Sequence, residues 1–289
     1  MTDTEVLRRF NRTYTQRIGA LDESFLGLGL PLGAARLVFE IGAAGSTVRD
    51  LRARLGLDSG QLARQLRRLE DDGLATVAPD AADRRRRTVR LTGKGLRFRD
   101  RLDDRSEQLA RRLVAPLTTR QRERLTDALA TADLLVRAAT VDLRAVHPGS
   151  PDAKRAVQHY FDELAVRFPT GFDPGDHHDE EHMAPGAGAF VVATSDGEPV
   201  ACGGVQALAP GVGEIKRMWV HPGWRGAGLG SRLLRHLEQV TRDLGQHTVR
   251  LDTNGTLVEA IAMYERAGYS PIERYNDNPY AQRWYSKQL

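Results

Sequence analysis

The chain has 289 residues, a formal net charge of +4 and a single cysteine, Cys202. This length allows two domains, each with its own core. One thiol excludes an intrachain disulfide and a cysteine-based zinc site, which is typical of a reducing compartment. No apolar run reaches the roughly 18 residues that a membrane span needs, and residues 1–30 mix charged with apolar side chains. We therefore expect a two-domain cytoplasmic protein without a membrane partner.

Charge is divided unevenly between the two halves. Residues 1–145 carry a net charge of +8, and residues 146–289 carry a net charge of −4. A basic first half indicates a nucleic-acid partner, and the acidic second half indicates a different task. An arginine-rich codon bias would give the same composition, so the local motifs have to decide.

The first half predicts a helix-turn-helix. Apolar spacing is helical over residues 6–28 and 34–41. A short helix is then predicted to end at Gly56, and a second one to begin at Asp58 or Ser59. Three leucines share one face of this second helix, Leu62, Leu66 and Leu69. The polar and basic side chains left facing outward suit the major groove of DNA and are Gln61, Arg64, Gln65 and Arg68.

A β-hairpin is predicted next, with strands over residues 74–77 and 88–91. Its tip carries four consecutive arginines, Arg84, Arg85, Arg86 and Arg87. Such a tip is unsuited to a core and suits a phosphate backbone or a narrow minor groove. Residues 92–139 are helical in pattern, broken at Pro116, and offer more leucines than one winged helix needs. We expect these long helices to form a dimer.

Two stretches, SGQLARQLRRLEDDGL and DRRRRTVRLTGKG, resemble the MarR family of winged-helix regulators over about residues 5–140. The resemblance implies a homodimer on double-stranded DNA, with the helix at 59–72 in the major groove. It places Ser59, Gln61, Arg64 and Gln65 against bases and Arg85 and Arg86 in the minor groove. A two-fold dimer implies a roughly palindromic operator.

A proline- and glycine-rich stretch, AVHPGSPDAK, predicts a linker at 145–152 between a domain at 1–144 and one at 153–289. After it come a helix over 153–168, the strands AFVVAT, PVACGGVQAL and EIKRMWV, a helix over 231–244, the strand VRLDTN and the helix LVEAIAMYERAGY. This order predicts an α+β domain with a mostly antiparallel sheet, closed by a strand from the C-terminal tail.

The glycine-rich stretch HPGWRGAGLGSRLL lies between a strand and a helix, where backbone N–H groups bind anions. A dinucleotide fingerprint fails because Ser231 stands where its third glycine belongs. A Walker A loop fails because Leu229 stands where its lysine belongs. An R-x-x-G-x-G sequence starting at Arg225 remains.

This loop, with EIKRMWVHP before it and LDTN and AIAMYERAGY after it, resembles the GNAT N-acetyltransferases over about residues 153–289. The resemblance implies acetyl-CoA as co-substrate. The pyrophosphate would be held by Arg225, Gly226, Ala227, Gly228, Leu229, Gly230 and Ser231. The pantetheine arm would lie along Met218, Trp219 and Val220 and near Asn254.

Attack by an amine on a thioester needs a proton acceptor, because the ammonium form is not nucleophilic. By resemblance, Glu214 is the expected general base and Tyr264 the general acid. Cys202 would allow an acyl-enzyme, but its apolar strand favours a core thiol and direct transfer. The acidic, histidine-rich loop at 173–182 would allow a metal, but a solvated loop with no metal site is expected. The resemblance implies that this loop covers the acceptor, and we hypothesise that its acidic residues select a cationic amine.

We therefore expect a bifunctional protein, a DNA-binding regulator joined to an N-acetyltransferase with a small-molecule or lysine-type amine acceptor. In one alternative the second domain is a non-catalytic acetyl-CoA sensor. In another the winged helix only dimerises.

Overall fold

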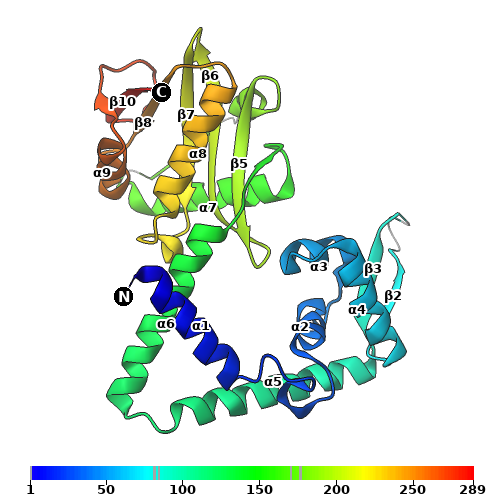
Figure 1. The fold of residues 1–289 in the computed structure, drawn as a ribbon. Coiled ribbons are helices and arrows are strands. Elements are labelled where there is room, and N and C mark those ends of the chain that lie inside the picture. Colours follow the sequence, from blue (N-terminus) through cyan, green and yellow to red (C-terminus); the bar gives the residue numbers. More distant parts are fainter. Residues whose placement is uncertain (1, 81–82, 84, 170, 176–177) are drawn as a thin grey trace. The chain divides into compact units, whose positions relative to one another are not determined.

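The computed structural model describes residues 2–80, 83, 85–169, 171–175 and 178–289, without the side chains of residues 178–180. Two compact units are present, Met1–Glu123 and Arg124–Leu289 (Figure 1). Within the described ranges, no helix is long and apolar enough to cross a membrane.

The first unit is mainly helical with a small sheet. Its elements are α1 (Asp3–Arg17), η1 (Phe25–Gly27), α2 (Leu32–Ile41), β1 (Ser46–Thr47), α3 (Val48–Leu55), α4 (Ser59–Asp71), β2 (Ala75–Pro79), β3 (Arg87–Leu91) and α5 (Gly93–Val114). The antiparallel sheet has the order β1-β3-β2. Leucines of α3 and α4 are buried with α2 and Val89 of β3 in one core. The predicted winged helix-turn-helix is confirmed.

The first predicted helix is shorter than expected. α1 ends at Arg17, and residues 18–31 form turns that include η1. The irregular segment after α1 also contributes to the core, since Leu30 is buried in it. Apolar residues therefore continue past the end of the helix. On α1 itself, Val6, Leu7 and Phe10 are exposed. The predicted break at Pro116 is present, since α6 (Thr119–Thr140) follows α5 after a short turn.

The second unit is an α+β domain. After the last turns of α6 come β4 (Leu143–Val146), α7 (Pro151–Arg167), η2 (His178–Met183), β5 (Gly188–Ser195), β6 (Glu198–Ala209), β7 (Val212–Val220), η3 (Pro222–Trp224), α8 (Leu229–Asp243), β8 (Thr248–Thr253), α9 (Val258–Arg266), β9 (Ser270–Pro271) and β10 (Arg283–Gln288). The sheet order is β4-β5-β6-β7-β8-β10-β9, and of these pairs only β7 with β8 is parallel. The predicted mostly antiparallel sheet and the tail strand are confirmed.

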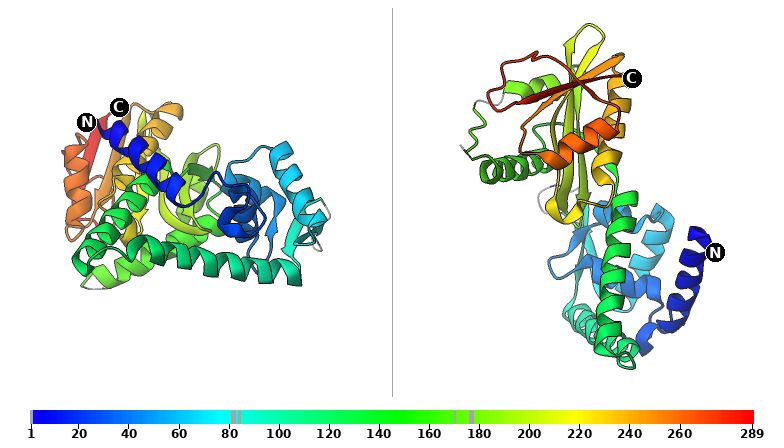
Figure 2. Two further views of the ribbon diagram at one scale, coloured as in Figure 1. Left: turned by 60° about the horizontal axis from the view of Figure 1, so that its bottom comes forward. Right: turned by 90° about the vertical axis from the view of Figure 1, so that its left-hand side faces the viewer.

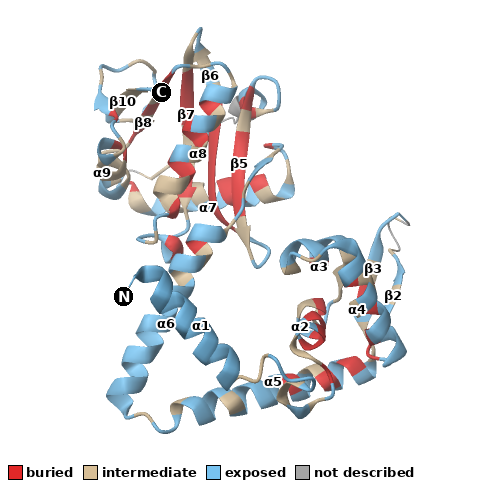
Figure 3. Ribbon diagram, in the orientation of Figure 1, coloured by how far each residue is buried: buried red, intermediate tan, exposed pale blue. Residues whose placement is uncertain are grey.

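Helices cover both faces of this sheet (Figure 2). Side chains alternate between the faces along a strand. Val191 of β5 therefore packs with α8, while Val192 packs with α7. The buried residues lie along the strands and on the sides of the helices that face the sheet (Figure 3).

The boundary between the units differs from the predicted linker. Ala145 and Val146 lie in β4, paired with Val191 and Phe190 of β5. Ser150 caps α7 by accepting a hydrogen bond from the Ala153 N–H, and Pro151 occupies its first turn. A Pro-Gly-Ser-Pro run is equally typical of a tight turn that starts a helix. The division between the units falls inside α6 instead.

Candidate active site and nucleic-acid surface

The parallel strands β7 and β8 separate part of the way along the sheet. Their ladder joins residues 212–214 to residues 248–250 and ends at the pair Glu214–Arg250. Beyond it, β7 pairs only with β6, so the N–H and C=O groups on its other edge do not pair with β8. A bulge sits in this free stretch, where Arg217 adopts a φ of +53° opposite Gly203. The opening leaves room for an extended ligand between the strands.

The glycine loop lies at the end of β7 and leads into α8. Gly226 and Gly228 adopt φ values of +76° and +84°, and a Cβ at either position would meet no atom within 4 Å. Gly228 is the N-cap of α8 and supplies no capping side chain, so the first N–H groups of the helix remain available. This backbone fits a pyrophosphate group.

A cavity of about 480 Å³, here called the loop-side cavity, opens beside this loop. Eight of the predicted ligand residues line it, Met218, Trp219, Val220, Arg225, Gly226, Gly228, Gly230 and Ser231. Leu229 is buried in the core, and Ala227 packs against that core. The lining residues that were not predicted include Glu163, Arg167, Glu259 and Met263. They come from α7 and α9, which a loop motif does not reveal.

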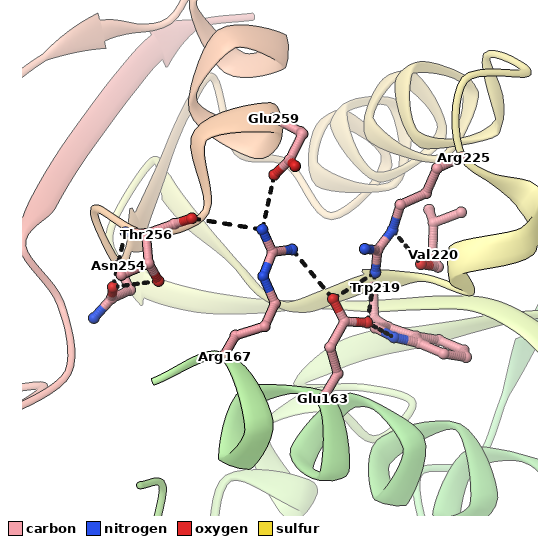
Figure 4. Close-up of polar contacts among 8 residues, drawn as sticks. All are labelled: Glu163, Arg167, Trp219, Val220, Arg225, Asn254, Thr256 and Glu259. Carbon is pink, nitrogen blue, oxygen red and sulfur yellow. Dashed lines mark hydrogen bonds and ion pairs between the residues drawn. The ribbon is translucent and has the colours of Figure 1, made fainter. Parts of the chain in front are cut away.

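A polar network joins α7 to both sides of the loop-side cavity (Figure 4). Glu163 pairs with Arg225 and accepts a 2.9 Å hydrogen bond from Trp219 Nε1. Burial raises the pKa of Glu163, but hydrogen bonds from Arg225 and Trp219 outweigh it, so the pKa is lowered overall. Arg225 Nε also donates to the Val220 carbonyl over 3.0 Å. The Arg225 side chain therefore fixes the loop to β7 and α7.

Arg167, one turn along α7, extends this network toward α9. It pairs with Glu163 at 3.2 Å and with Glu259 at 2.9 Å. Arg167 and Arg225, which both line the loop-side cavity, are thus each held by a carboxylate.

A second cavity of about 480 Å³, here called the aromatic cavity, is lined by α7, the following loop, β7, β8 and residues 276–281. Six residues line both cavities, Tyr160, Leu164, Met218, Leu257, Ala260 and Tyr264. The two cavities therefore adjoin at the separated strands.

Tyr264 lies at this junction. Its ring is buried in the core, and its hydroxyl lies 3.9 Å from Met218 Sδ. Burial, together with the negative charge of Asp252, raises the pKa of Tyr264, so the phenol stays protonated at neutral pH. Tyr264 therefore contributes a protonated phenol to the place where the two cavities adjoin.

Glu214 lies behind the site and not in it. It is 2% exposed and accepts hydrogen bonds from Gln206 (2.8 Å), Tyr275 (2.9 Å) and Asn276 (3.3 Å). Lys216 Nζ is 3.6 Å from Glu214 Oε2. The described residues that line the two cavities include Asp252 but not Glu214.

Asp252, on β8, is one of two carboxylates of described residues that line the aromatic cavity, the other being Asp173 of the loop after α7. It accepts hydrogen bonds from Asn276 and Asn278. Burial raises the pKa of Asp252, helped by the Glu214 charge and opposed by the Asn276 hydrogen bond and Lys216. Asp252 was named from the sequence only as part of the strand LDTN and was not singled out as a site residue.

Two other predicted residues have structural partners. Asn254 lines the aromatic cavity, but its amide donates to the Tyr280 carbonyl over 2.7 Å and its oxygen accepts from Thr256. Burial raises the pKa of Cys202 to about 12, and its thiol donates to the Arg217 carbonyl. A protonated core thiol is a poor nucleophile, which agrees with the expected direct transfer. Among the described residues, no group of histidine, cysteine and carboxylate side chains is arranged to hold a metal.

In the first unit, α4 presents the predicted polar face. Asp58 caps it by accepting from the Gln61 N–H over 2.8 Å. Ser59, Gln61, Arg64 and Arg68 are exposed. Gln65 differs from the prediction: it is half-buried, and its amide nitrogen is near α2, 3.5 Å from where a Cβ on Gly33 would lie. It follows Leu62 by three residues and so lies on the flank of the apolar stripe.

The hairpin of β2 and β3 carries the wing arginines. Arg85, Arg86 and Arg87 are exposed, and Arg86 pairs with Asp83 at 3.3 Å. Arg84 lies outside the described residues. Together with the exposed residues of α4, these side chains form a basic surface on the winged helix-turn-helix.

The separated strands, the glycine loop before α8 and the junction at Tyr264 define an acyl-CoA-dependent acyltransferase domain. Residues 157–269 match the acetyltransferase (GNAT) family model. An uncharacterized N-acetyltransferase of Schizosaccharomyces pombe is 31% identical over 131 residues, which are 44% of this chain and 80% of that protein. The chain belongs to the GNAT family of N-acetyltransferases.

The first unit carries a MarR-like domain, because residues 28–86 match the MarR family model. Among solved structures, a GNAT acetyltransferase from Staphylococcus aureus has a TM-score of 0.46 at 18% identity, covering 51% of this chain and 99% of that one. A MarR variant from Escherichia coli has a TM-score of 0.40 at 22% identity, covering 46% of this chain and 96% of that one. The two family models together show a MarR-like domain fused to a GNAT domain.

Proposed function

We propose that this protein transfers an acetyl group directly from acetyl-CoA to an amine and that its first domain binds DNA as a homodimer. The observation that carries the enzymatic part is the junction of two cavities of equal volume at Tyr264 and Met218. One cavity adjoins the anion-binding loop, and the other is closed by aromatic and amide side chains. A donor and an acceptor would therefore meet at one point.

The loop-side cavity would take acetyl-CoA as substrate. The N–H groups at the start of α8 would bind its pyrophosphate, and the free edge of β7 at Met218 and Val220 would bind its pantetheine arm. An N–H donor at the thioester oxygen would stabilise the charge that develops there by about 3 kcal/mol, as in other oxyanion sites. Arg225 contributes by holding the loop through Glu163 and Val220.

The aromatic cavity would take the amine. We assign the proton-accepting role to Asp252, which faces this cavity, with Glu214 acting through it by raising its pKa. Asp252 takes a proton from the ammonium group, and the neutral amine nitrogen attacks the thioester carbon to give a tetrahedral intermediate. The carbon–sulfur bond then breaks as the carbonyl re-forms, the Tyr264 hydroxyl donates its proton to the leaving sulfur, and the second proton lost by the nitrogen restores the phenol. A carboxylate with a raised pKa is better matched to an amine than an ordinary one.

The first domain would bind a roughly palindromic operator. The exposed residues of α4 fit the major groove, and the wing arginines fit the minor groove. Exposed apolar residues on α1 support a partner for that helix, and a second copy supplies one with two-fold symmetry. Both activities suit the cytoplasm, where DNA and acetyl-CoA meet.

The runner-up is a regulator whose GNAT domain senses acetyl-CoA without turnover. The two functions are separated by measuring free CoA release from acetyl-CoA across a panel of primary amines, with Tyr264→Phe as control. An enzyme releases CoA only with an acceptor present and loses that rate in the variant. Micromolar acetyl-CoA binding with no release on any amine would favour the sensor.

A further inference from the structure

We propose that the acceptor is a small amine that also carries a carboxylate and an aromatic group, as an aromatic amino acid does, and that Arg217 binds its carboxylate. This inference rests on the proposed acetyl transfer and names the substrate class of the same site. Neither the sequence motifs nor the family likeness defines that class.

The aromatic cavity is walled by a cluster of rings. Phe172 lies 5.3 Å from Phe161, 5.9 Å from Phe168 and 4.8 Å from Tyr280, measured between ring centroids. Phe168 and Tyr280 stack at 5.7 Å. Offset and tilted rings of this kind favour a further aromatic or apolar group between or against them. The wall therefore selects a planar or apolar part of the acceptor.

Arg217 provides a positive charge on the same wall. Its guanidinium lies 5.7 Å from the Phe161 ring centroid, and its side chain is half-buried. Within the described part of the chain, no carboxylate lies within ion-pair distance of it. The neighbouring cations differ, since Lys216 pairs with Glu214, and Arg167 and Arg225 pair with Glu163. A half-buried guanidinium without a carboxylate is a site for an anion.

The backbone conformation of Arg217 supports a binding role for its position on the cavity wall. A φ of +53° is strained for a side chain larger than glycine, and such strain gathers at binding sites. The bulge shifts Arg217 out of the alternation of β7, so that Lys216, Arg217 and Met218 all line the aromatic cavity.

The opposite charge lies on β8. Asp252 lines the same cavity and would receive the amine, while Arg217 would receive the carboxylate. A cavity of about 480 Å³ lies within the roughly 300–1,000 Å³ of small-molecule sites. Lys216 and Asp173 also line the cavity, but Lys216 pairs with Glu214 and the Asp173 carboxylate accepts a hydrogen bond from the Gly175 N–H. Arg217, Asp252 and the ring wall together match an amino acid with an aromatic side chain better than a diamine.

The test uses acceptors that differ only by a carboxylate, phenylalanine and phenethylamine. The full-length wild type should acetylate phenylalanine with the higher kcat/KM. In Arg217→Gln the ratio of the two kcat/KM values should fall about 10- to 100-fold, the range for a hydrogen-bonded charge. Arg217→Lys, which keeps the charge but not the planar fork, should lie between them. Arg274→Gln, an exposed arginine paired with Asp277, is the matched control and should leave the ratio unchanged.

A binding measurement makes the inference independent of turnover. Calorimetry on the CoA-loaded protein would compare N-acetylphenylalanine with N-acetylphenethylamine. Tighter binding of the carboxylated product, lost in Arg217→Gln, supports the inference whether or not any amine is acetylated. Absence of acetylation would reject the proposed enzyme but not this inference. Equal affinities or no measurable binding of either product, or a ratio that Arg217→Gln leaves unchanged, would overturn the inference while leaving acetyl transfer intact.

Discussion

The guanidinium of Arg137, near the end of α6, lies 4.9 Å from the ring centroid of Trp224, the residue before Arg225 in the glycine loop. The same side chain donates to Ser195 over 2.7 Å. On the other side of the loop, Arg232 of α8 donates to the Ala138 carbonyl over 3.1 Å. The last turns of α6 therefore belong to the acetyltransferase unit and hold both ends of its loop.

This arrangement predicts where the acetyltransferase unit can be cut. A fragment of residues 124–289 keeps the end of α6 and β4. A fragment of residues 147–289 loses both and exposes the edge of β5, which favours aggregation. Thermal unfolding should give the shorter fragment a clearly lower Tm and weaker acetyl-CoA binding. Equal values for the two fragments would show that α6 and β4 are dispensable.

Tyr264→Phe tests the proton donor with little change in packing. The ring fills the same core position, so the Tm and the Kd for acetyl-CoA should stay near wild type. Loss of a positioned proton donor should lower kcat by about 10²-fold, within the usual range for general acids. Steady-state CoA release and calorimetry measure these quantities, and an unchanged kcat would remove Tyr264 from the chemistry.

Asp252→Asn tests the proton acceptor through activity, pH and stability together. If Asp252 is the base, kcat/KM in the wild type rises with pH through its raised pKa, and the variant loses about 10²- to 10⁴-fold. Since the folded state raises this pKa, the folded state loses stability as pH rises through it. The neutral variant avoids that loss, so its Tm at pH 8 should equal or exceed that of wild type. A variant that keeps the pH profile would contradict the assignment.

The sequence was sufficient for the fold and for the loop, because both rest on local patterns. The glycine spacing before α8 and the alternation of β5 and β6 are properties of contiguous residues. Asp252 and Glu163 were missed because their roles depend on contacts with Asn276 and Arg225, far away along the chain. The linker was misplaced because the signals for a loop and for a capped helix start are the same.

Arg225→Gln tests the network of Figure 4. The substitution removes one of the cations that pair with Glu163 and leaves excess negative charge beside a cavity proposed for phosphates, so KM for acetyl-CoA should rise about 10-fold or more. The double variant Glu163→Gln with Arg225→Gln removes that negative charge and should recover part of the loss. Strictly additive effects in this double-mutant cycle would show that the two residues act independently.

The wing is tested by salt dependence. The DNA association constant should fall with salt, and the steepness of this fall is the slope of its logarithm against log salt concentration. Replacing Arg85, Arg86 and Arg87 with alanine should make the slope shallower by about 0.9 for each phosphate that the wing no longer neutralises. The matched control replaces three exposed arginines of α5, Arg97, Arg105 and Arg112, which changes the net charge equally. Electrophoretic or fluorescence titrations at several salt concentrations measure the slope. Equal slopes for both triple variants would assign the effect to net charge alone.

Transfer of an isotopically labelled acetyl group is the decisive measurement for the proposed acetyltransferase. The full-length protein is incubated with acetyl-labelled acetyl-CoA and a primary amine, and mass spectrometry follows the label. We expect a labelled N-acetyl amide in amounts equal to the CoA released, with both lost in Asp252→Asn and reduced in Tyr264→Phe. Tight binding of acetyl-CoA with no labelled amide on any amine would contradict it.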